Sequence, residues 1–210
     1  MEENSITYTK ANTPGTVVYV AVDKKFQGHL LIADEIKEDA KSAIERLKAL
    51  GIQKTVMLSG DNKEIANVVA DKIKIDEVHA ELLPDQKVSE LEKIEDANSS
   101  FGKIMFVGDG MNDAPVITRA DIGVAMGGLG VDAAIESADV VIMNDAPGKI
   151  PDAINVARRT RKIVVQNITL ALSIKVVVLV LGVIGMATMW EAVFADVGVA
   201  LLAILNSSRV

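Results

Sequence analysis

Ile104-Met-Phe-Val107 leads directly into Gly108-Asp-Gly-Met-Asn-Asp-Ala-Pro115, and this passage from an apolar run into a Gly- and Asp-rich loop decides the fold. The short apolar run predicts a strand that is buried in a sheet. The glycines let the backbone bend tightly and approach a ligand closely. Asp109 and Asp113 supply the hard oxygen ligands that suit magnesium, with a phosphate as a further ligand. A solvated acidic turn is the alternative for this loop taken alone.

Strands and helices alternate on both sides of this loop. Apolar, β-branched runs predict strands, and apolar residues that recur every three to four positions predict helices. The expected strands are 16–22, 29–33, 54–58, 104–107, 122–125 and 140–143, and the expected helices are about 34–51, 63–72, 85–95 and 133–138. This alternation is typical of an α/β fold in which a parallel sheet carries helices on both faces. Ligands of such sheets bind at the carboxyl ends of the strands, where the 108–115 loop lies.

Two further elements carry candidate chemistry. Ser59-Gly60-Asp61-Asn62 follows a strand and can offer a hydroxyl and a backbone N–H to a phosphoryl oxygen. An ordinary turn with a helix cap has the same composition and is the alternative. Lys87 lies three residues after Pro84, in the first turn of a helix, where a cation is unfavourable unless an anion such as a phosphoryl group accompanies it. A surface lysine without a special role is the alternative there.

The C-terminal part of the chain has the composition of a membrane segment. Mean hydropathy is +0.30 although 24% of the residues are charged, and residues 163–210 hold only four of those charges. A helix is expected from Pro151 to the mid-180s, with transmembrane helices at about 163–188 and 191–207. The basic residues before the apolar part mark the cytoplasmic side, namely Arg158, Arg159, Arg161 and Lys162. A buried hairpin of a soluble protein is the alternative, but the apolar run exceeds what a core needs.

Lys175 and Asp196 are the charges that lie well inside this apolar segment. An ionisable residue within a membrane is a functional hypothesis by default, and pairing lowers the cost of both charges. If the turn centres on Trp190, the two residues lie at different depths. They can meet if the chain reverses near Gly185–Met186 or if the helices are strongly tilted, and we expect the former because Gly182 and Gly185 loosen that region. A lysine that snorkels to the interface is the alternative, but roughly 18 Å of helix separates Lys175 from Ile163.

Composition excludes several classes of protein. Half of the residues are hydrophobic, which argues against disorder. The net charge is −7 and only 3% of the residues are aromatic, so nucleic-acid binding is not expected. The chain has no cysteine, which excludes disulfides and thiolate ligands from within it. The polar, acidic N-terminus lacks the pattern of a secretory signal.

The loop at 108–115 resembles the GDGxNDxP signature of P-type ATPases, and Ser59–Asp61 is similar to their TGD motif with Ser in place of Thr. Further stretches resemble the heavy-metal-transporting branch of that family, namely 51–62, 84–88, 120–127 and 138–141. The resemblance covers nearly the whole chain. It implies an α/β, haloacid-dehalogenase-like (Rossmann-like) phosphorylation domain followed by a transmembrane helical hairpin.

The resemblance also implies a reaction. The family uses ATP to phosphorylate an aspartate and hydrolyses the acyl-phosphate as metal is released, which is covalent catalysis in two steps. Magnesium would be bound by Asp109, with Asp113 and Asn112 shaping the same site. Phosphoryl oxygens would be contacted by Lys87, Ser59 and Gly60, which stabilise charge in the transition state. The catalytic set implied in this way is Ser59, Gly60, Asp61, Lys87 and Asn112.

The membrane segment resembles the zinc/cadmium/lead branch of the family. Asn167 precedes Lys175 by eight residues, and Asp196-Val197-Gly198 follows on the next helix. In that branch the aspartate serves the transported metal and the lysine acts as a built-in counter-ion. The choice among zinc, cadmium, lead and cobalt does not follow from these residues.

Several motifs of the family are missing from the chain. The Asp-Lys-Thr-Gly-Thr segment with the phosphorylated aspartate is absent, as are the nucleotide-domain His-Pro motif and the membrane Cys-Pro-Cys ligands. Lys37 stands where the family usually has arginine. We therefore expect the C-terminal third of a pump, inactive alone, which depends on the missing N-terminal portion. The expected domains are 1–28 (end of the nucleotide-binding domain), 29–150 (phosphorylation domain without its nucleophile strand) and 151–210 (connecting helix and last two transmembrane helices).

The expected location is the cell membrane, with the soluble domain and the C-terminus in the cytoplasm. The expected partners are a zinc, cadmium or lead ion and the lipid bilayer. One alternative function is a membrane-anchored haloacid-dehalogenase-like phosphatase, which would need its own Asp-x-Asp nucleophile; Asp23 and Asp34 do not form one. The other is a non-catalytic remnant that binds magnesium or a full-length pump.

Overall fold

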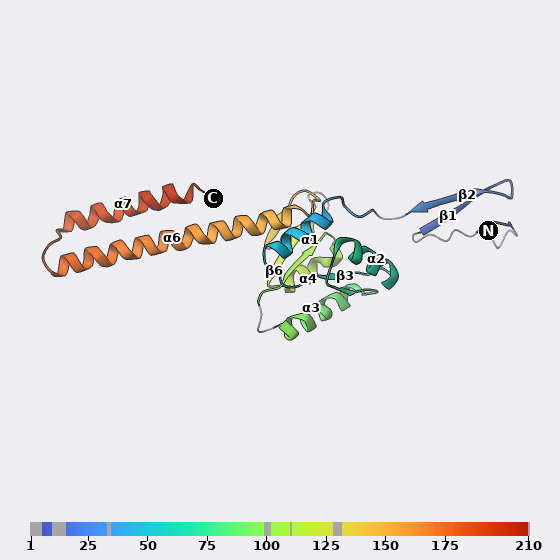
Figure 1. The fold of residues 1–210 in the computed structure, drawn as a ribbon, viewed down its shortest axis with the longest axis horizontal. Helices are drawn as coiled ribbons and strands as arrows, with labels where there is room; N and C mark the ends of the chain where they lie inside the picture. Colours follow the sequence, from blue (N-terminus) through green and yellow to red (C-terminus); the bar gives the residue numbers. More distant parts are fainter. Residues whose placement is uncertain are drawn as a thin grey trace. The chain divides into compact units, whose positions relative to one another are not determined.

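The computed structural model describes residues 6–9, 16–32, 35–98, 102–109, 111–127 and 132–209. The chain divides into two compact units, Met1–Gly148 and Lys149–Val210. Strands and helices alternate in the first unit, and the second consists of two long helices (Figure 1). The expected class, an α/β domain followed by a helical hairpin, is therefore confirmed.

The first unit opens with an antiparallel hairpin, β1 (Thr16–Val22) and β2 (Lys25–Ile32). Asp23 and Lys24, which join the strands, both take positive φ angles, 51° and 60°. A turn of this hand matches the twist of the two strands. The domain boundary predicted after residue 28 falls within β2, and the assignment of residues 1–28 to a nucleotide-binding domain stays a prediction.

The remaining elements of this unit follow in the expected order. They are α1 (Ala40–Ala49), β3 (Val56–Leu58), α2 (Lys63–Ile73), β4 (Glu77–His79), α3 (Pro84–Asn98), β5 (Met105–Gly108), α4 (Ala114–Arg119), β6 (Ile122–Met126), α5 (Asp132–Ser137) and β7 (Val140–Ile142). Figure 1 shows helices α1 to α4 around these strands. The expected helix at 34–51 begins later, at Ala40. Asp39 directly precedes it, and the Asp39 carboxylate accepts the Gly148 N–H (2.7 Å) and does not cap the helix. Two short elements, β4 and α4, were not expected.

The parallel strands form two separate ladders in place of the single expected sheet. β3 pairs with β4, and β5, β6 and β7 pair in that order. β6 has neighbours on both edges, and its residues Gly123–Met126 are buried. β3 and the first three residues of β5 are equally apolar but only half-buried. The expectation that 104–107 is a buried strand is therefore wrong, because these residues are half-buried and β5 is an edge strand of its ladder.

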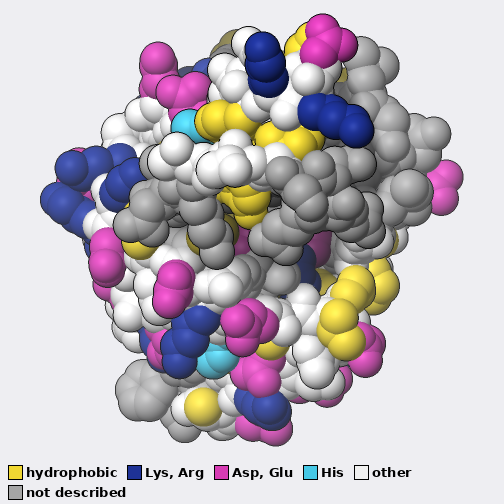
Figure 2. Space-filling view, turned by 90° about the vertical axis from the view of Figure 1, so that its right-hand side faces the viewer, with side chains coloured by type: hydrophobic (Ala, Val, Ile, Leu, Met, Phe, Trp, Pro, Cys, Tyr) yellow, Lys and Arg dark blue, Asp and Glu magenta, His cyan; other side chains and the backbone are white. Residues whose placement is uncertain are grey.

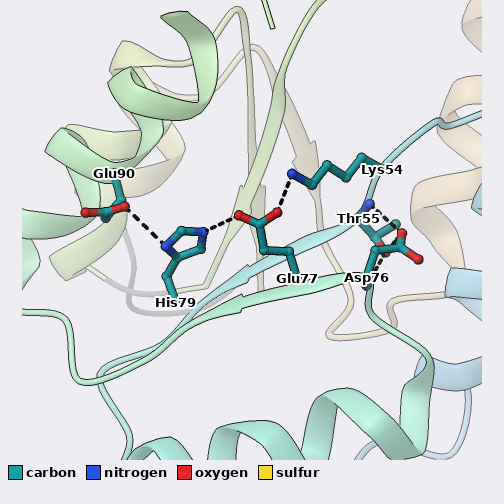
Figure 3. Close-up of polar contacts among 6 residues, drawn as sticks. All are labelled: Lys54, Thr55, Asp76, Glu77, His79 and Glu90. Carbon is teal, nitrogen blue, oxygen red and sulfur yellow. Dashed lines mark hydrogen bonds and ion pairs between the residues drawn. The ribbon is translucent and has the colours of Figure 1, made fainter. Parts of the chain in front are cut away.

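A network of polar groups fixes the β3–β4 ladder at its first residues (Figure 3). The Asp76 carboxylate accepts hydrogen bonds from the Thr55 backbone N–H (2.9 Å) and hydroxyl (2.7 Å) and from Lys48 Nζ (2.5 Å). These donors favour the ionised form, so Lys48 first and Thr55 second lower the pKa of Asp76 from 3.8 to about 2. Asp76 thus ties the start of β4 to the start of β3 and to α1.

A second chain of side chains links β4 to α3 (Figure 3). His79 Nε2 lies 2.7 Å from a Glu77 carboxylate oxygen, and His79 Nδ1 lies 3.2 Å from Glu90 on α3. Glu77 also pairs with Lys54. The pKa of Glu77 is lowered, chiefly by Lys54, and that of Glu90 is lowered, chiefly by Lys93. Figure 2 shows acidic and basic side chains interspersed in the same way over one face of the molecule.

Backbone contact fixes the identity of one residue of β6. A Cβ on Gly123 would lie 2.4 Å from the Ile117 carbonyl oxygen, a distance that no side chain can occupy. Ile117 and Ala125 form the buried core here, with Phe106 and Ala138 packed against them. Glycine thus lets α4 pack directly on the strand.

The second unit is a hairpin of α6 (Lys149–Val183) and α7 (Met189–Ser207), which run side by side (Figure 1). Both helices are long and apolar enough to cross a membrane, as judged by length and composition alone. The chain reverses between them through Gly185, whose φ is +75°, which confirms the expected reversal near Gly185–Met186. Trp190 lies in the first turn of α7, not at the centre of the reversal, because Thr188 and Glu191 form a capping box that starts the helix there.

Replacing Asp76 with Asn is expected to lower the free energy of unfolding of the first unit by about 1 kcal/mol at pH 7, because bonds to an ionised carboxylate are lost. The pKa of Asp76 lies below its usual 3.8, so this contribution is complete above about pH 5 and is lost as the pH falls towards 2. Urea unfolding followed by circular dichroism from pH 7 to pH 2 measures the difference. Asp71→Asn, an exposed position on α2, is the matched control. A difference that stays constant down to pH 2 would contradict the assignment.

Candidate functional site

The loop after β3 is a compact turn that leads into α2. The Ser59 hydroxyl accepts the Asp61 N–H (3.0 Å) and donates to the Asp61 carboxylate (2.9 Å). Asn62 caps α2 by accepting the Glu64 N–H at 2.7 Å. The turn-and-cap interpretation of this loop is therefore correct as far as local structure goes. It leaves open a further role for the Ser59 hydroxyl, which is held at the carboxyl end of β3.

The segment after β4 supports this turn through backbone hydrogen bonds. Leu82 N–H donates to the Ser59 carbonyl (3.0 Å) and Glu81 N–H to the Asp61 carbonyl (2.9 Å). A Cβ on Gly60 would lie 3.3 Å from the Leu82 carbonyl, so a larger residue would press on this support. The loop after β4 was not predicted from the sequence. Glu81 in this loop has a positive φ of 60°, which is uncommon for a glutamate and cannot be read from the residue type.

The loop after β5 turns sharply into α4. Asp109 and Asn112 are exposed, and Asp113 is 9% exposed. A Cβ on Gly108 would lie 2.7 Å from the Asp113 Cβ, so glycine is required for the loop to fold back on the strand. Gly110 of the predicted motif lies outside the described residues. The loop therefore presents one carboxylate outward and holds the other inward.

The half-buried Lys87 forms an ion pair with the buried Asp113. Lys87 Nζ donates to Asp113 Oδ1 at 2.8 Å, and the two side chains are 17% and 12% exposed. The lysine in the first turn of α3 thus has the anionic partner that its position demands, and the partner comes from this chain. The pair joins α3, which follows β4, to the start of α4, which follows β5.

The structure brings some of the predicted residues together and leaves others apart. Lys87 meets Asp113, and Ser59 meets Asp61. Among the described residues, no hydrogen bond or ion pair joins the Ser59 loop to Asp109 or to Lys87. The same residues include no group of three acidic or histidine side chains that could hold a metal ion. The oxygens of Asp109, Asn112 and Asp113 have the chemistry that magnesium prefers, but they supply only part of a coordination shell, and water and phosphate commonly supply the rest.

The second candidate site lies between the two long helices. Lys175 Nζ of α6 lies 3.2 Å from Asp196 Oδ1 of α7. The pair borders a cavity of about 380 Å³ whose other lining residues are apolar, among them Ile174, Val178 and Val199. Both charged side chains remain about two-thirds exposed, at 64% and 66%. The expected pairing of these two charges is therefore present in the hairpin.

Asn167 and Gly198 are not part of this ion pair. Asn167 bonds instead to residues near the end of α7, Ala203, Asn206 and Ser207, about 12 Å along the helix from Lys175. A Cβ on Gly198 would meet open space, so its small size is not demanded within the hairpin. Sequence reasoning missed Asn206 and Ser207, although the polar run before Arg209 was a visible signal.

Comparison with known proteins gives a consistent result. The haloacid dehalogenase-like hydrolase family matches residues 2–121, more than half of the chain. The zinc-transporting ATPase of Synechocystis sp. is 60% identical over all 210 residues, and the cadmium, zinc and cobalt-transporting ATPase of Bacillus subtilis is 55% identical over the same length. A crystal structure of a zinc-transporting PIB-type ATPase in the E2·Pi state aligns with 92% of the chain at a TM-score of 0.80 and 37% identity.

The chain spans only part of these relatives, 29% of the Synechocystis protein, 30% of the Bacillus protein and 31% of the solved structure. The matches nevertheless run through both units, the α/β domain and the apolar hairpin. The chain therefore belongs to the haloacid dehalogenase-like hydrolase family and corresponds over its full length to the C-terminal portion of zinc- and cadmium-transporting P-type ATPases.

Proposed function

We propose that the chain acts as part of an ATP-driven pump that exports zinc, cadmium or lead through an aspartyl-phosphate. The observation that carries this proposal is that one chain contains both a candidate phosphoryl site and a pair of charges between two apolar helices. The loops at the carboxyl ends of β3 and β5 offer groups for a phosphoryl site, and an ion pair lies between two apolar helices. The full-length similarity to metal-transporting ATPases supports the same combination.

In the phosphoryl site, Asp109 would hold magnesium, with Asn112 and Asp113 completing the polar surroundings. Magnesium, when bound, would neutralise charge on the phosphoryl oxygens. The exposed Asp109 carboxylate suits that role because it faces no cation in the chain, among the described residues. The buried Asp113 instead holds the half-buried Lys87, so that an ammonium group is already oriented and partly desolvated.

Ser59 and Gly60 would contact the phosphoryl oxygens with a hydroxyl and a backbone N–H, and Asp61 would keep the Ser59 hydroxyl in place. The two Ser59–Asp61 hydrogen bonds support this division of roles, because they fix the hydroxyl at the end of β3. Positioned donors of this kind stabilise the charge that develops in phosphoryl transfer without reorganising.

The missing nucleophile would come from the rest of the pump. In β3, the backbone groups of Thr55 and Ser59 face β4, so those of Val56 and Leu58 point to the opposite edge. In β5, Ile104 faces β6, so Met105 and Val107 point away from it. These two edges have no partner strand within the described part of the chain. Apolar, half-buried strands with a free edge support the proposal that a further strand, carrying the aspartate, pairs there.

In the membrane, Asp196 would serve the transported metal and Lys175 would neutralise it when the metal leaves. The 3.2 Å separation supports this exchange of partners, since the same carboxylate oxygen is within reach of the ammonium group. Pairing also reduces the cost of holding two charges in hydrocarbon, about 3 kcal/mol for each charge alone. The basic residues before the apolar part of α6 and Arg209 beyond α7 favour a cytoplasmic position for both ends.

Lys87→Ala is expected to slow aspartyl-phosphate formation and turnover about 100-fold or more, because an oriented donor to the phosphoryl group is lost. The assay uses labelled ATP and the chain fused to the part of the Synechocystis sp. relative that it does not span, called here the complementary part. Lys93→Ala, an exposed lysine on the same helix, is the matched control. The unfused chain is expected to incorporate no label. Incorporation by the unfused chain would contradict the proposal and favour an independent phosphatase.

Asp196→Asn is expected to abolish metal-stimulated ATP turnover in the same fusion, because an amide cannot replace the carboxylate at the metal. A double exchange, Lys175→Asp with Asp196→Lys, keeps the ion pair but moves the carboxylate to α6. We expect this exchange variant to fold and remain inactive with zinc or cadmium. Restored stimulation in the exchange variant would mean that the pair only holds the helices together, and would refute the metal role.

A further inference from the structure

The interface between α6 and α7 is a seam of residues that recur every three to four positions. On α6 these buried or half-buried residues include Ile163, Asn167, Ala171, Ile174 and Val178, and α7 repeats the spacing from Ala192 to Asn206. Most of them are small or aliphatic. Packing of such residues and hydrogen bonds between polar side chains are the two contributions that hold membrane helices together.

Two asparagines interrupt the apolar seam at one end. Asn167 Nδ2 donates to the Ala203 carbonyl (3.2 Å) and to the Ser207 hydroxyl (3.0 Å), and Asn167 Oδ1 accepts from Asn206 Nδ2 (2.8 Å). Asn206 Oδ1 in turn accepts from Arg209 (3.0 Å). Every polar atom of the Asn167 side chain is therefore used, and three of its contacts cross between the helices.

Lys175 and Asp196 lie beside the seam, each one residue after a seam position, Ile174 and Ala195. The seam itself does not hold them together. Their 3.2 Å contact depends on the axial alignment of α6 with α7. A slip of one helical turn would move one residue past the other by about 5.4 Å and break the contact.

We propose that Asn167 and Asn206 form a clamp that fixes the alignment of α6 and α7 and thereby places Lys175 opposite Asp196. Polar side chains at single seam positions are known to specify register, because any other alignment leaves their amides unpaired in apolar surroundings. Asn167 is thus a positioning residue, not a metal ligand. The functional consequence rests on the metal role proposed for Asp196, while the alignment itself does not.

Distance supports a positioning role over a ligand role. Asn167 lies about 12 Å along α6 from Lys175, beyond the reach of any metal held by Asp196. Its carbonyl oxygen, the atom that would bind a cation, is already occupied by the Asn206 amide. Asn167 lies five residues after Lys162, the last basic residue before the apolar part of α6. The clamp is therefore at one end of the hairpin.

Engineered cysteine pairs measure the alignment directly, because the chain has no cysteine of its own. The first pair is Ala171→Cys with Val199→Cys. These two positions lie one helical turn from the Asn167–Ala203 contact, so a disulfide between them forms in the observed alignment. Ala171→Cys with Ala195→Cys reports a slip of one turn. The whole chain is placed in lipid vesicles, and the ratio of disulfide formed by the two pairs is compared between backgrounds.

Asn167→Leu is expected to lower this ratio roughly ten-fold or more, because each hydrogen bond between membrane helices contributes about three-fold. Asn206→Leu should act in the same direction, and Asn167→Gln, which keeps the amide, should recover part of the ratio. Thr169→Val is the matched control, since the Thr169 hydroxyl donates to the Val165 carbonyl of the same helix (2.8 Å). An unchanged ratio in Asn167→Leu, or an equal loss in Thr169→Val, would overturn the clamp.

The fused pump separates this inference from the metal role. Asn167→Leu is expected to raise the zinc concentration for half-maximal stimulation, with Asn167→Gln restoring it in part. Asp196→Asn should leave the cross-linking ratio high while it abolishes stimulation. If Asp196→Asn keeps full stimulation, the metal role fails and the clamp stands on the cross-linking ratio. If the ratio does not respond to Asn167→Leu, the clamp fails and the metal role stands.

Discussion

The ion pair between Lys87 and Asp113 links the two parallel ladders of the first unit. The two parallel ladders share no backbone hydrogen bonds among the described residues, so side chains must hold them together. Lys87 belongs to the helix after β4 and Asp113 to the turn after β5, and their 2.8 Å contact crosses between the ladders. Arg119 on α4 adds two contacts to α3, with Glu92 and Glu95. An ion pair of this kind is costly to break, because either charge left alone would be desolvated without a partner.

The strands of the first unit differ in how far their apolar side chains are covered. β6 has neighbours on both sides and is buried, whereas β3 and β5 carry apolar side chains of the same type and remain half-buried at a free edge. An apolar edge strand is a liability that proteins normally cover. The open edges thus agree with a chain that spans only 29% and 30% of the length of these relatives.

Most of the fold could be predicted from the sequence, since long periodic segments and glycine-rich loops carry strong local signals. The order of the strands, the extent of α2 and the reversal at Gly185 followed from such signals. β4 did not, because three residues are too few to show a period. The burial of β5 was misjudged because the hydrophobicity of a strand shows that it can be buried. It does not show whether this chain contains the neighbouring strand that would bury it. In the candidate site, the residue types of Lys87 and Asp113 were expected, but their pairing and the amide contacts of Asn167 depend on tertiary structure.

Hydrogen exchange at the two free edges tests the proposal that a further strand, from the part of the relatives that this chain does not span, pairs there. The amides of Val56, Leu58, Met105 and Val107 point to those edges, whereas Ser59 N–H is already bonded to the His79 carbonyl (2.9 Å). Exchange is measured for the chain alone and after addition of the complementary part. The four edge amides are expected to become at least ten-fold slower to exchange, roughly the effect of one backbone hydrogen bond formed in a sheet, while Ser59 changes little. Unchanged exchange at all four edge amides in a complex that has formed would contradict the proposed pairing.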